Sequence, residues 1–410
     1  MTNTREIPAF PFLASAAFIS GANLRMFDAL LPTLAEDFAV APTVASIVVT
    51  AFTLSYGLFQ IVHGPLGDRV GRLRTVAVAM LIACLGSLGS ALAPTLTSLT
   101  VLRFITGIGA AGIIPVSIAW IGDHTTYEHR QSTLARFIGF SVSGQILGPA
   151  LGGAVAEFLS WREVFYVLTG TFLVVAIALL RLDLRERRTG NPPLTHIDEH
   201  FLRTYQEVLS VPWVRTVLLT VFLEGALFYG SFAYIGAWLK ETFDLSYLII
   251  GAMLAGFGIG GLLYTMLVRK LLRRLGEVGL VLGAAVVFLV FYECLPLSPA
   301  WQVTGPLCAL GGFGFYMLHN TLQTKATAMY PRARGTAISA FALSLFCGQA
   351  FGVALFGRAI AAFGYAPIFV FSGFALLLLA WFFSKRLTRS GDDGRDDRSQ
   401  DHSDVVRAEP

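Results

Sequence analysis

Apolar segments about 20 residues long recur along almost the whole chain, and this repetition constrains the fold more than any other feature of the sequence. A helix of that length crosses the ~30 Å hydrocarbon core of a bilayer. Helices also satisfy their own backbone hydrogen bonds, which lipid cannot do for them. We predict about twelve membrane-spanning helices, near 11–34, 44–63, 75–93, 98–121, 134–156, 161–181, 213–238, 247–268, 277–295, 302–325, 336–358 and 365–384.

The composition excludes two other classes of protein. Hydrophobic residues make up 55% of the chain and charged residues only 14%, against a norm of roughly 25% in soluble domains. A soluble protein needs more charge to cover its surface, and a disordered chain holds far fewer Phe and Leu residues. The four cysteines form no CxxC pair, so neither a disulfide framework nor a zinc site is expected.

The basic residues predict the topology. They follow the second, fourth, sixth, eighth, tenth and twelfth predicted helices, whereas the alternate loops hold almost none. The positive-inside rule therefore places both termini in the cytoplasm of a multi-pass protein of the cell membrane, the inner membrane in a Gram-negative bacterium. This distribution explains the net charge of +4 without a nucleic-acid partner.

The two halves of the chain repeat each other. A shift of 205 residues aligns Leu34–Phe38 with Leu239–Phe243, and a shift of 204 aligns Gly144–Gln145 with Gly348–Gln349. Parallel repeats of this kind occur in secondary transporters, with the substrate site between the halves. We predict an all-α membrane fold of two pseudo-symmetric six-helix bundles. The chain then divides into four parts: a bundle at 1–181, a cytoplasmic linker at 182–212, a bundle at 213–385 and a disordered tail at 386–410.

Four sequence motifs resemble those of the major facilitator superfamily. They read GPLGDRVGRLR at 64–74, LRFITGIG at 102–109, GQILGPALGG at 144–153 and WREVF at 161–165. With the repeat, the resemblance covers about residues 11–385. The motif in the fifth helix is similar to that of proton-coupled exporters in this superfamily. The resemblance implies alternating access without a cofactor, driven by the proton gradient.

The loop after the second helix is predicted to act as a conformational latch. Gly64 and Gly71 permit a tight turn, and Asp68 carries a charge suited to the arginines Arg69 and Arg72 or to a helix N-terminus. The resemblance implies that Asp68 holds the outward-facing state. The second half has Arg273 at the position equivalent to Asp68, so the latch is expected on one side only.

The fifth helix is predicted to contain a hinge. Gly144, Gly148 and Gly152 lie four residues apart, which lets another helix pack closely, and Gly153 follows directly. Pro149 bends the helix or frees a carbonyl group. The exporter resemblance implies that this segment shapes the outward gate, although close helix packing alone also accounts for the glycines.

Few charged residues lie at membrane depth, where each costs at least ~2–3 kcal/mol and marks function by default. Arg25 and Asp28 share one helix face and are able to pair, and Arg103 adds a second cation to the N-terminal half. Glu224 has no basic residue within one turn, and burial without a partner favours a protonated carboxyl group. We predict Glu224 as the proton carrier, with Asp28 as the alternative.

A polar stripe on the tenth helix is predicted to line the substrate cavity together with polar residues of other helices. The predicted cavity residues are Arg25, Arg103, Asn23, Tyr56, Gln60, Gln145, Tyr316, His319, Asn320, Gln323 and Gln349.

Two other motifs could indicate a nucleotide site or a metal site, but both interpretations are weaker. The glycines at 107–112 spell GxGxxG but lie inside a membrane helix, and His196 and His200 fit a solvated linker better than a metal site.

The favoured function is therefore proton-coupled export of a small organic solute by a monomer in the lipid bilayer. Uptake of a small polar or anionic solute together with protons is the first alternative, in which Arg25 and Arg103 bind the substrate. A polytopic membrane enzyme or receptor is the second. It is disfavoured because no predicted loop is large enough for a catalytic domain, and we expect neither catalytic residues nor a metal site.

Overall fold

The computed structural model describes residues 8–188 and 201–406, and none of these residues lies in a β-strand. The N-terminal half contains α1 (Phe10–Asp37), α2 (Pro42–Ala45), α3 (Ile47–Val70), α4 (Arg72–Ala91), α5 (Leu96–Ala110), α6 (Ile113–His124), α7 (Tyr127–Phe158) and α8 (Trp161–Arg188). The C-terminal half contains α9 (Phe201–Ser210), α10 (Pro212–Glu224), a π-helix (Gly225–Tyr229), α11 (Gly230–Phe232), α12 (Ile235–Phe243), α13 (Tyr247–Cys294), α14 (Thr304–Ala328), α15 (Arg334–Phe363) and α16 (Tyr365–Val406), with 3₁₀ turns at Trp301–Val303 and Pro331–Ala333.

The helices agree with the twelve predicted spans. Nine helical stretches of the described residues are long and apolar enough to cross a membrane. One of them, α13, contains both predicted spans 247–268 and 277–295, and the two parts meet at a kink where the backbone of Gly276 is not helical. Gly276 has a φ of +66°, a conformation that favours glycine. The first and tenth predicted spans correspond to α1 and α14.

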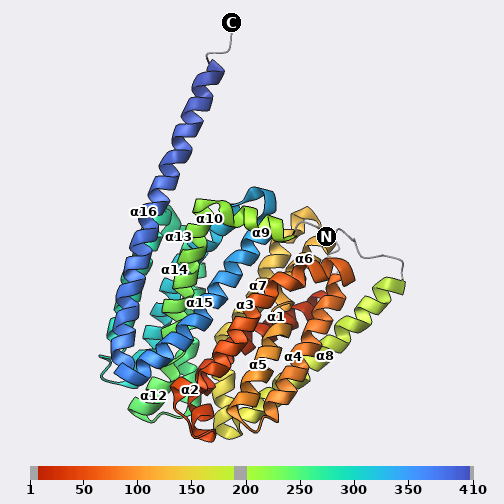
Figure 1. Cartoon of the computed structure of the whole chain (residues 1–410), viewed down its shortest axis with the longest axis vertical. Helices are drawn as coiled ribbons and strands as arrows, with labels where there is room; N and C mark the ends of the chain where they lie inside the picture. Colours follow the sequence, from red (N-terminus) through yellow and green to blue (C-terminus); the bar gives the residue numbers. More distant parts are fainter. Residues whose placement is uncertain (1–7, 189–200, 407–410) are drawn as a thin grey trace.

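Two helical bundles lie side by side, the N-terminal half (red to yellow) beside the C-terminal half (green to blue) in Figure 1. Within the first bundle α1 packs on α7, and α4 packs on α5 and α8. Within the second, α13 packs on α14 and α16, and α10 packs on α15. The bundles meet where α7 contacts α13 and where α3 contacts α15. The predicted fold class is confirmed.

The bundles are joined at the end that bears α2 and α12, which we call the closed end. The hydroxyl group of Tyr234 donates to Ser46 Oγ at 2.7 Å, and that of Tyr247 donates to Glu36 Oε2 at 2.5 Å. The backbone N–H of Tyr247 also donates to Glu157 Oε2 at 2.8 Å. These bonds connect α1, α2 and α7 to the second bundle.

The other end bears α9 and the loop at Gly71, and we call it the open end. No heavy atom of a neighbouring segment lies within 4 Å of where a Cβ would stand at Gly64 of α3 or Gly139 of α7. Gln323 of α14 is exposed. The hydrogen bonds between the bundles named above thus lie at the closed end, whereas these three residues near the opposite end are exposed.

Helices extend into the predicted linker and into the predicted tail. Helix α8 continues past residue 181 to Arg188, and α9 occupies part of the predicted linker. Helix α16 continues beyond Lys385 to Val406 and projects from the bundle, where the composition predicted a disordered tail. A helix needs no outside partner for its backbone hydrogen bonds, so a polar segment can prolong a membrane helix into solvent. His196 and His200 lie outside the described residues.

Candidate functional site

Glu224 and His319 form a buried pair inside the second bundle. Glu224 is the last residue of α10 and its side chain is fully buried. Its Oε2 atom lies 2.9 Å from Nδ1 of His319 on α14, whereas its Oε1 atom has no hydrogen-bond partner among the described residues. The His319 ring stacks on Phe315, with centroids 4.9 Å apart. The pair therefore joins two groups that can each carry a proton.

A π-helix follows Glu224 directly. It covers Gly225–Tyr229, and such single wide turns often occur at functional sites. Gly225 lies so close to the backbone of α15 that a Cβ would collide with the carbonyl oxygen of Leu345. The wide turn directs Tyr229 toward the first bundle. This turn could not be predicted from the sequence, because an extra residue in a helical turn does not change a continuous apolar pattern.

Arg25 connects the two bundles at this point. Its guanidinium carbon lies 3.5 Å from the centroid of the Tyr229 ring, and its Nη1 atom lies 3.7 Å from Oδ2 of Asp28. Both side chains are buried, at 4% and 1% exposure. Neither carboxylate oxygen of Asp28 has a hydrogen-bond partner among the described residues. The Arg25–Asp28 pair therefore lies beside the helix that carries Glu224, at membrane depth.

Arg103 lies apart from this pair, within the first bundle. Its Nη1 atom donates to Asn23 Oδ1 at 2.8 Å. Its guanidinium carbon lies 4.0 Å from the ring centroids of both Phe27 and Phe52. Three neighbouring groups thus enclose a cation that is only 1% exposed. The sequence could not distinguish this enclosed position from a place in the cavity.

The other predicted cavity residues vary in position. Tyr56 packs edge-on against Phe346 of α15, across the contact between the bundles. Gln349 is fully buried, and both polar atoms of its amide group lack a partner among the described residues. The remaining residues are partly exposed or exposed: Gln60, Gln145, Tyr316, Asn320 and Gln323.

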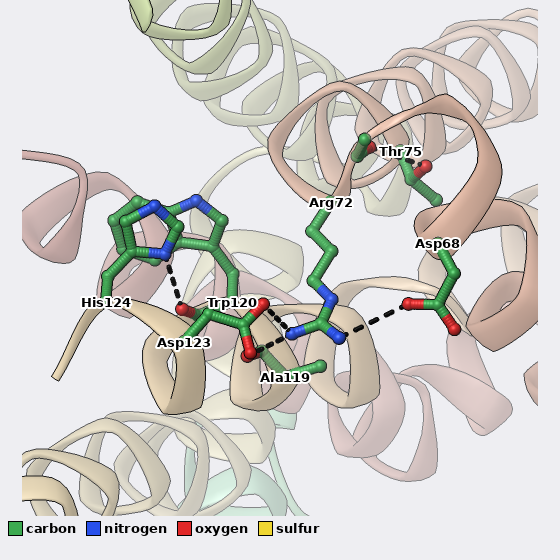
Figure 2. Close-up of polar contacts among 8 residues, drawn as sticks. Asp68, Arg72, Thr75, Ala119, Trp120, Asp123 and His124 are labelled. Atoms are coloured by element: carbon green, nitrogen blue, oxygen red, sulfur yellow. Dashed lines mark hydrogen bonds and ion pairs between the residues drawn. The ribbon is translucent and has the colours of Figure 1, made fainter. Parts of the chain in front are cut away.

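The predicted latch contains an additional carboxylate. Arg72 lies between Asp68 of α3 and Asp123 of α6, as Figure 2 shows, with 3.3 Å separating Arg72 Nη2 from Asp68 Oδ1. Its Nη1 atom also donates to the carbonyl oxygen of Ala119 at 2.6 Å. Gly71 has a φ of +105°, which turns the chain between α3 and α4. All these groups belong to the first bundle, while Arg69 is exposed.

The helix-five motif lies on α7 and contacts two different helices. A Cβ at Gly144, Gly148 or Gly152 would collide with the backbone of α1 at Phe18, Ala22 and Met26, respectively. A Cβ at Gly153 would collide with the carbonyl oxygen of Tyr247 on α13.

The carbonyl oxygen of Pro149 lies against Gly251, which is also on α13. One face of the motif therefore packs within the first bundle, and the other packs against the second bundle near the closed end.

Comparisons with known proteins agree with this fold. Residues 13–346 match the profile of the Major Facilitator Superfamily. The chain is 24% identical over 347 residues to the uncharacterized transporter YceJ of Bacillus subtilis, covering 84% of this chain and 87% of YceJ. It is 28% identical over 170 residues to the putative multidrug resistance protein MdtD of Escherichia fergusonii, covering 42% of this chain and 36% of MdtD.

A solved structure has the same fold. The bacterial homologue of the human lysosomal transporter Spinster, in an inward-facing and unoccupied conformation, superimposes with a TM-score of 0.71 at 16% sequence identity. The alignment covers 94% of this chain and 98% of that one.

Proposed function

The chain belongs to the major facilitator superfamily of membrane transporters, and from this premise we propose that it exports a small organic solute in exchange for protons. The observation that carries the proposal is the fully buried Glu224 carboxyl group, paired with His319 at 2.9 Å inside the second bundle. A buried carboxyl group can cycle between its neutral and charged forms only when water reaches it. Alternating access supplies water from one side at a time.

Coupling requires that protonation changes the relative stability of the two conformations. Glu224 precedes the π-helix that carries Tyr229, and Tyr229 contacts Arg25 of the other bundle. A change of charge at Glu224 therefore acts on the helical segment whose Tyr229 contacts Arg25 of the first bundle. Asp28 pairs with Arg25 at the same place and is the alternative carrier.

Two observations support export over uptake. The motif at 144–153, which resembles that of proton-coupled exporters, supplies Gly153 and Pro149 to the contact with α13 near the closed end. Uptake of an anion through Arg25 and Arg103 would need two available cations, but Phe27, Phe52 and Asn23 enclose Arg103. The match to MdtD, described as a putative multidrug resistance protein, also favours an organic solute.

The predicted topology determines which side of the membrane each end of the molecule faces. With both termini in the cytoplasm, the open end faces the cytoplasm and the closed end faces outward. The described state is then the inward-facing one, which receives a solute from the cytoplasm before the bundles rearrange to the outward-facing state.

Transport into proteoliposomes tests the proposal. The purified protein is reconstituted with an imposed pH gradient and offered cationic, neutral and anionic organic compounds in turn. Exchange against protons predicts accumulation of a solute when the lumen is more acidic than the bath, because protons then leave as solute enters. Accumulation only with an alkaline lumen would instead establish uptake together with protons. Empty liposomes under the same gradient report passive partition of weak bases and acids.

A further inference from the structure

A pocket of about 350 Å³ lies between α10 and α16 on the second bundle, separate from the site described above. Arg215 of α10 and Arg386 of α16 line one part of it. Its apolar wall consists of Leu219 and Leu223 of α10 and Leu379 and Phe382 of α16, and Pro212, Thr216 and Thr220 complete the lining. Leu219 is 59% exposed and Phe382 is 44% exposed, so this face is directed to the surroundings of the bundle.

The order of the lining residues gives the pocket a polarity gradient. Along α10 the chain runs from Arg215 to Leu223, away from the open end, and along α16 it runs from Leu379 to Arg386, toward that end. Both arginines therefore lie near the open end, and the apolar side chains lie deeper. About two turns of α10 separate Arg215 from Leu223, which corresponds to a depth of about 12 Å.

The two arginines are available to an anion. Among the described residues, no carboxylate lies within ion-pair distance of either guanidinium group. The Arg386 guanidinium carbon lies 5.2 Å from the centroid of the Phe382 ring. Pro212 also lines the pocket and begins α10, whose N-terminus has no side-chain cap, so the helix dipole adds to the positive potential.

Aromatic residues mark the depth of this pocket in the bilayer. Trp213 stacks on Phe383 with centroids 6.1 Å apart, and Trp381 is 52% exposed beside Lys385. Tryptophan side chains concentrate at the boundary between lipid and water. The arginines thus lie at the level of the lipid headgroups and the leucines at the level of the acyl chains.

We propose that this pocket binds an anionic phospholipid, with its phosphate group between Arg215 and Arg386 and one acyl chain along Leu219 and Leu223. Basic pockets between membrane helices recognise such headgroups. A soluble anion would use the arginines but would leave the exposed apolar wall uncovered. A zwitterionic lipid would cover the wall but would add a cation next to two others. The proposal does not depend on the solute or on the direction of transport.

Lipid titration of the full-length protein tests this site. The protein in a neutral detergent is titrated with phosphatidylglycerol, phosphatidylcholine or inorganic phosphate, and bound lipid is counted by native mass spectrometry. We expect one phosphatidylglycerol molecule to bind more tightly than phosphatidylcholine. The double variant Arg215→Gln/Arg386→Gln should weaken that binding roughly thirtyfold, because it removes two cationic contacts at the headgroup. Phosphatidylcholine binding should change little.

Two further variants separate the possible sources of a signal. Arg269→Gln/Arg273→Gln removes two exposed arginines of α13 outside the pocket and should leave the affinity for phosphatidylglycerol unchanged. Leu219→Trp fills the apolar wall while keeping both arginines, and it should also weaken lipid binding. Equal affinity of the pocket variant and the parent would overturn the proposal. Full competition by inorganic phosphate would instead identify a site for a free anion.

Discussion

Adding one methyl group at Gly251 should open the closed end of the molecule. The Cβ atom of Gly251→Ala would collide with the carbonyl oxygen of Pro149 and lie 3.2 Å from Cα of Ala150. Both are backbone atoms of α7, which cannot move aside as a side chain does. Overpacking of this kind costs about 1–3 kcal/mol. The cost applies only while α7 and α13 touch, whereas the gain in helix propensity from alanine applies in both conformations and cancels.

The expected shift follows from these numbers. A penalty of about 1–3 kcal/mol lowers the ratio of the described conformation to the alternative by roughly 5- to 150-fold, since 1.4 kcal/mol corresponds to a factor of ten. A cysteine at Ser46 reports the change, because Ser46 is 2% exposed and bonded to Tyr234 at the contact between the bundles. In a background without native cysteines, a membrane-impermeant maleimide should label Ser46→Cys faster when Gly251→Ala is also present.

Gly139→Ala is the matched control. This residue also lies in a helix, but no heavy atom of a neighbouring segment is within 4 Å of the new methyl group. Its labelling rate should equal that of the parent. If Gly251→Ala labels no faster than Gly139→Ala, the contact between α7 and α13 does not limit opening, and the reasoning is refuted.

Three other substitutions separate the parts of the mechanism. Asp68→Asn should keep the protein folded and inserted but slow turnover several-fold, because Arg72 retains Asp123 and loses only one side of the latch; full transport per quantified protein would contradict this. Tyr247→Phe removes a hydrogen bond to Glu36 worth about 0.5–1.5 kcal/mol and should raise maleimide labelling of Ser46→Cys about 2- to 12-fold, whereas an unchanged rate would exclude this bond from the closed end. Asp28→Asn leaves Arg25 buried without its counter-charge, at a cost of several kcal/mol, and should weaken solute binding measured by equilibrium titration. Normal affinity would show that the pair is not needed for binding.

The positions of the helices could be predicted from the sequence, because each span must satisfy its own backbone hydrogen bonds and present an apolar surface to lipid. That requirement predicted the helices on either side of Gly276, even though the structure joins them into the single element α13. The secondary structure of the segment beyond Lys385 could not be predicted in the same way. Its polar composition predicted a disordered tail, but the same composition also permits a helix that extends from the membrane into solvent.

The contacts of the candidate site depend on which helices become neighbours, and local patterns do not contain that information. Glu224 and His319 were each singled out, but their pairing needs α10 beside α14 and could not be derived from either helix alone. Asp123 was missed for the same reason. The sequence places it after the fourth predicted helix, and only the fold brings it to Arg72.

The most direct test of the proposed coupling compares net transport with exchange in Glu224→Gln proteoliposomes. Glutamine imitates the protonated carboxyl group permanently, so solute exchange between equal pH compartments should persist while accumulation driven by a pH gradient is lost. Glu207→Gln, a change at a half-exposed carboxylate of α9, should preserve both activities. Accumulation by Glu224→Gln at the rate of the parent, together with a loss of pH-driven accumulation alone in Asp28→Asn, would contradict the account and make Asp28 the proton carrier.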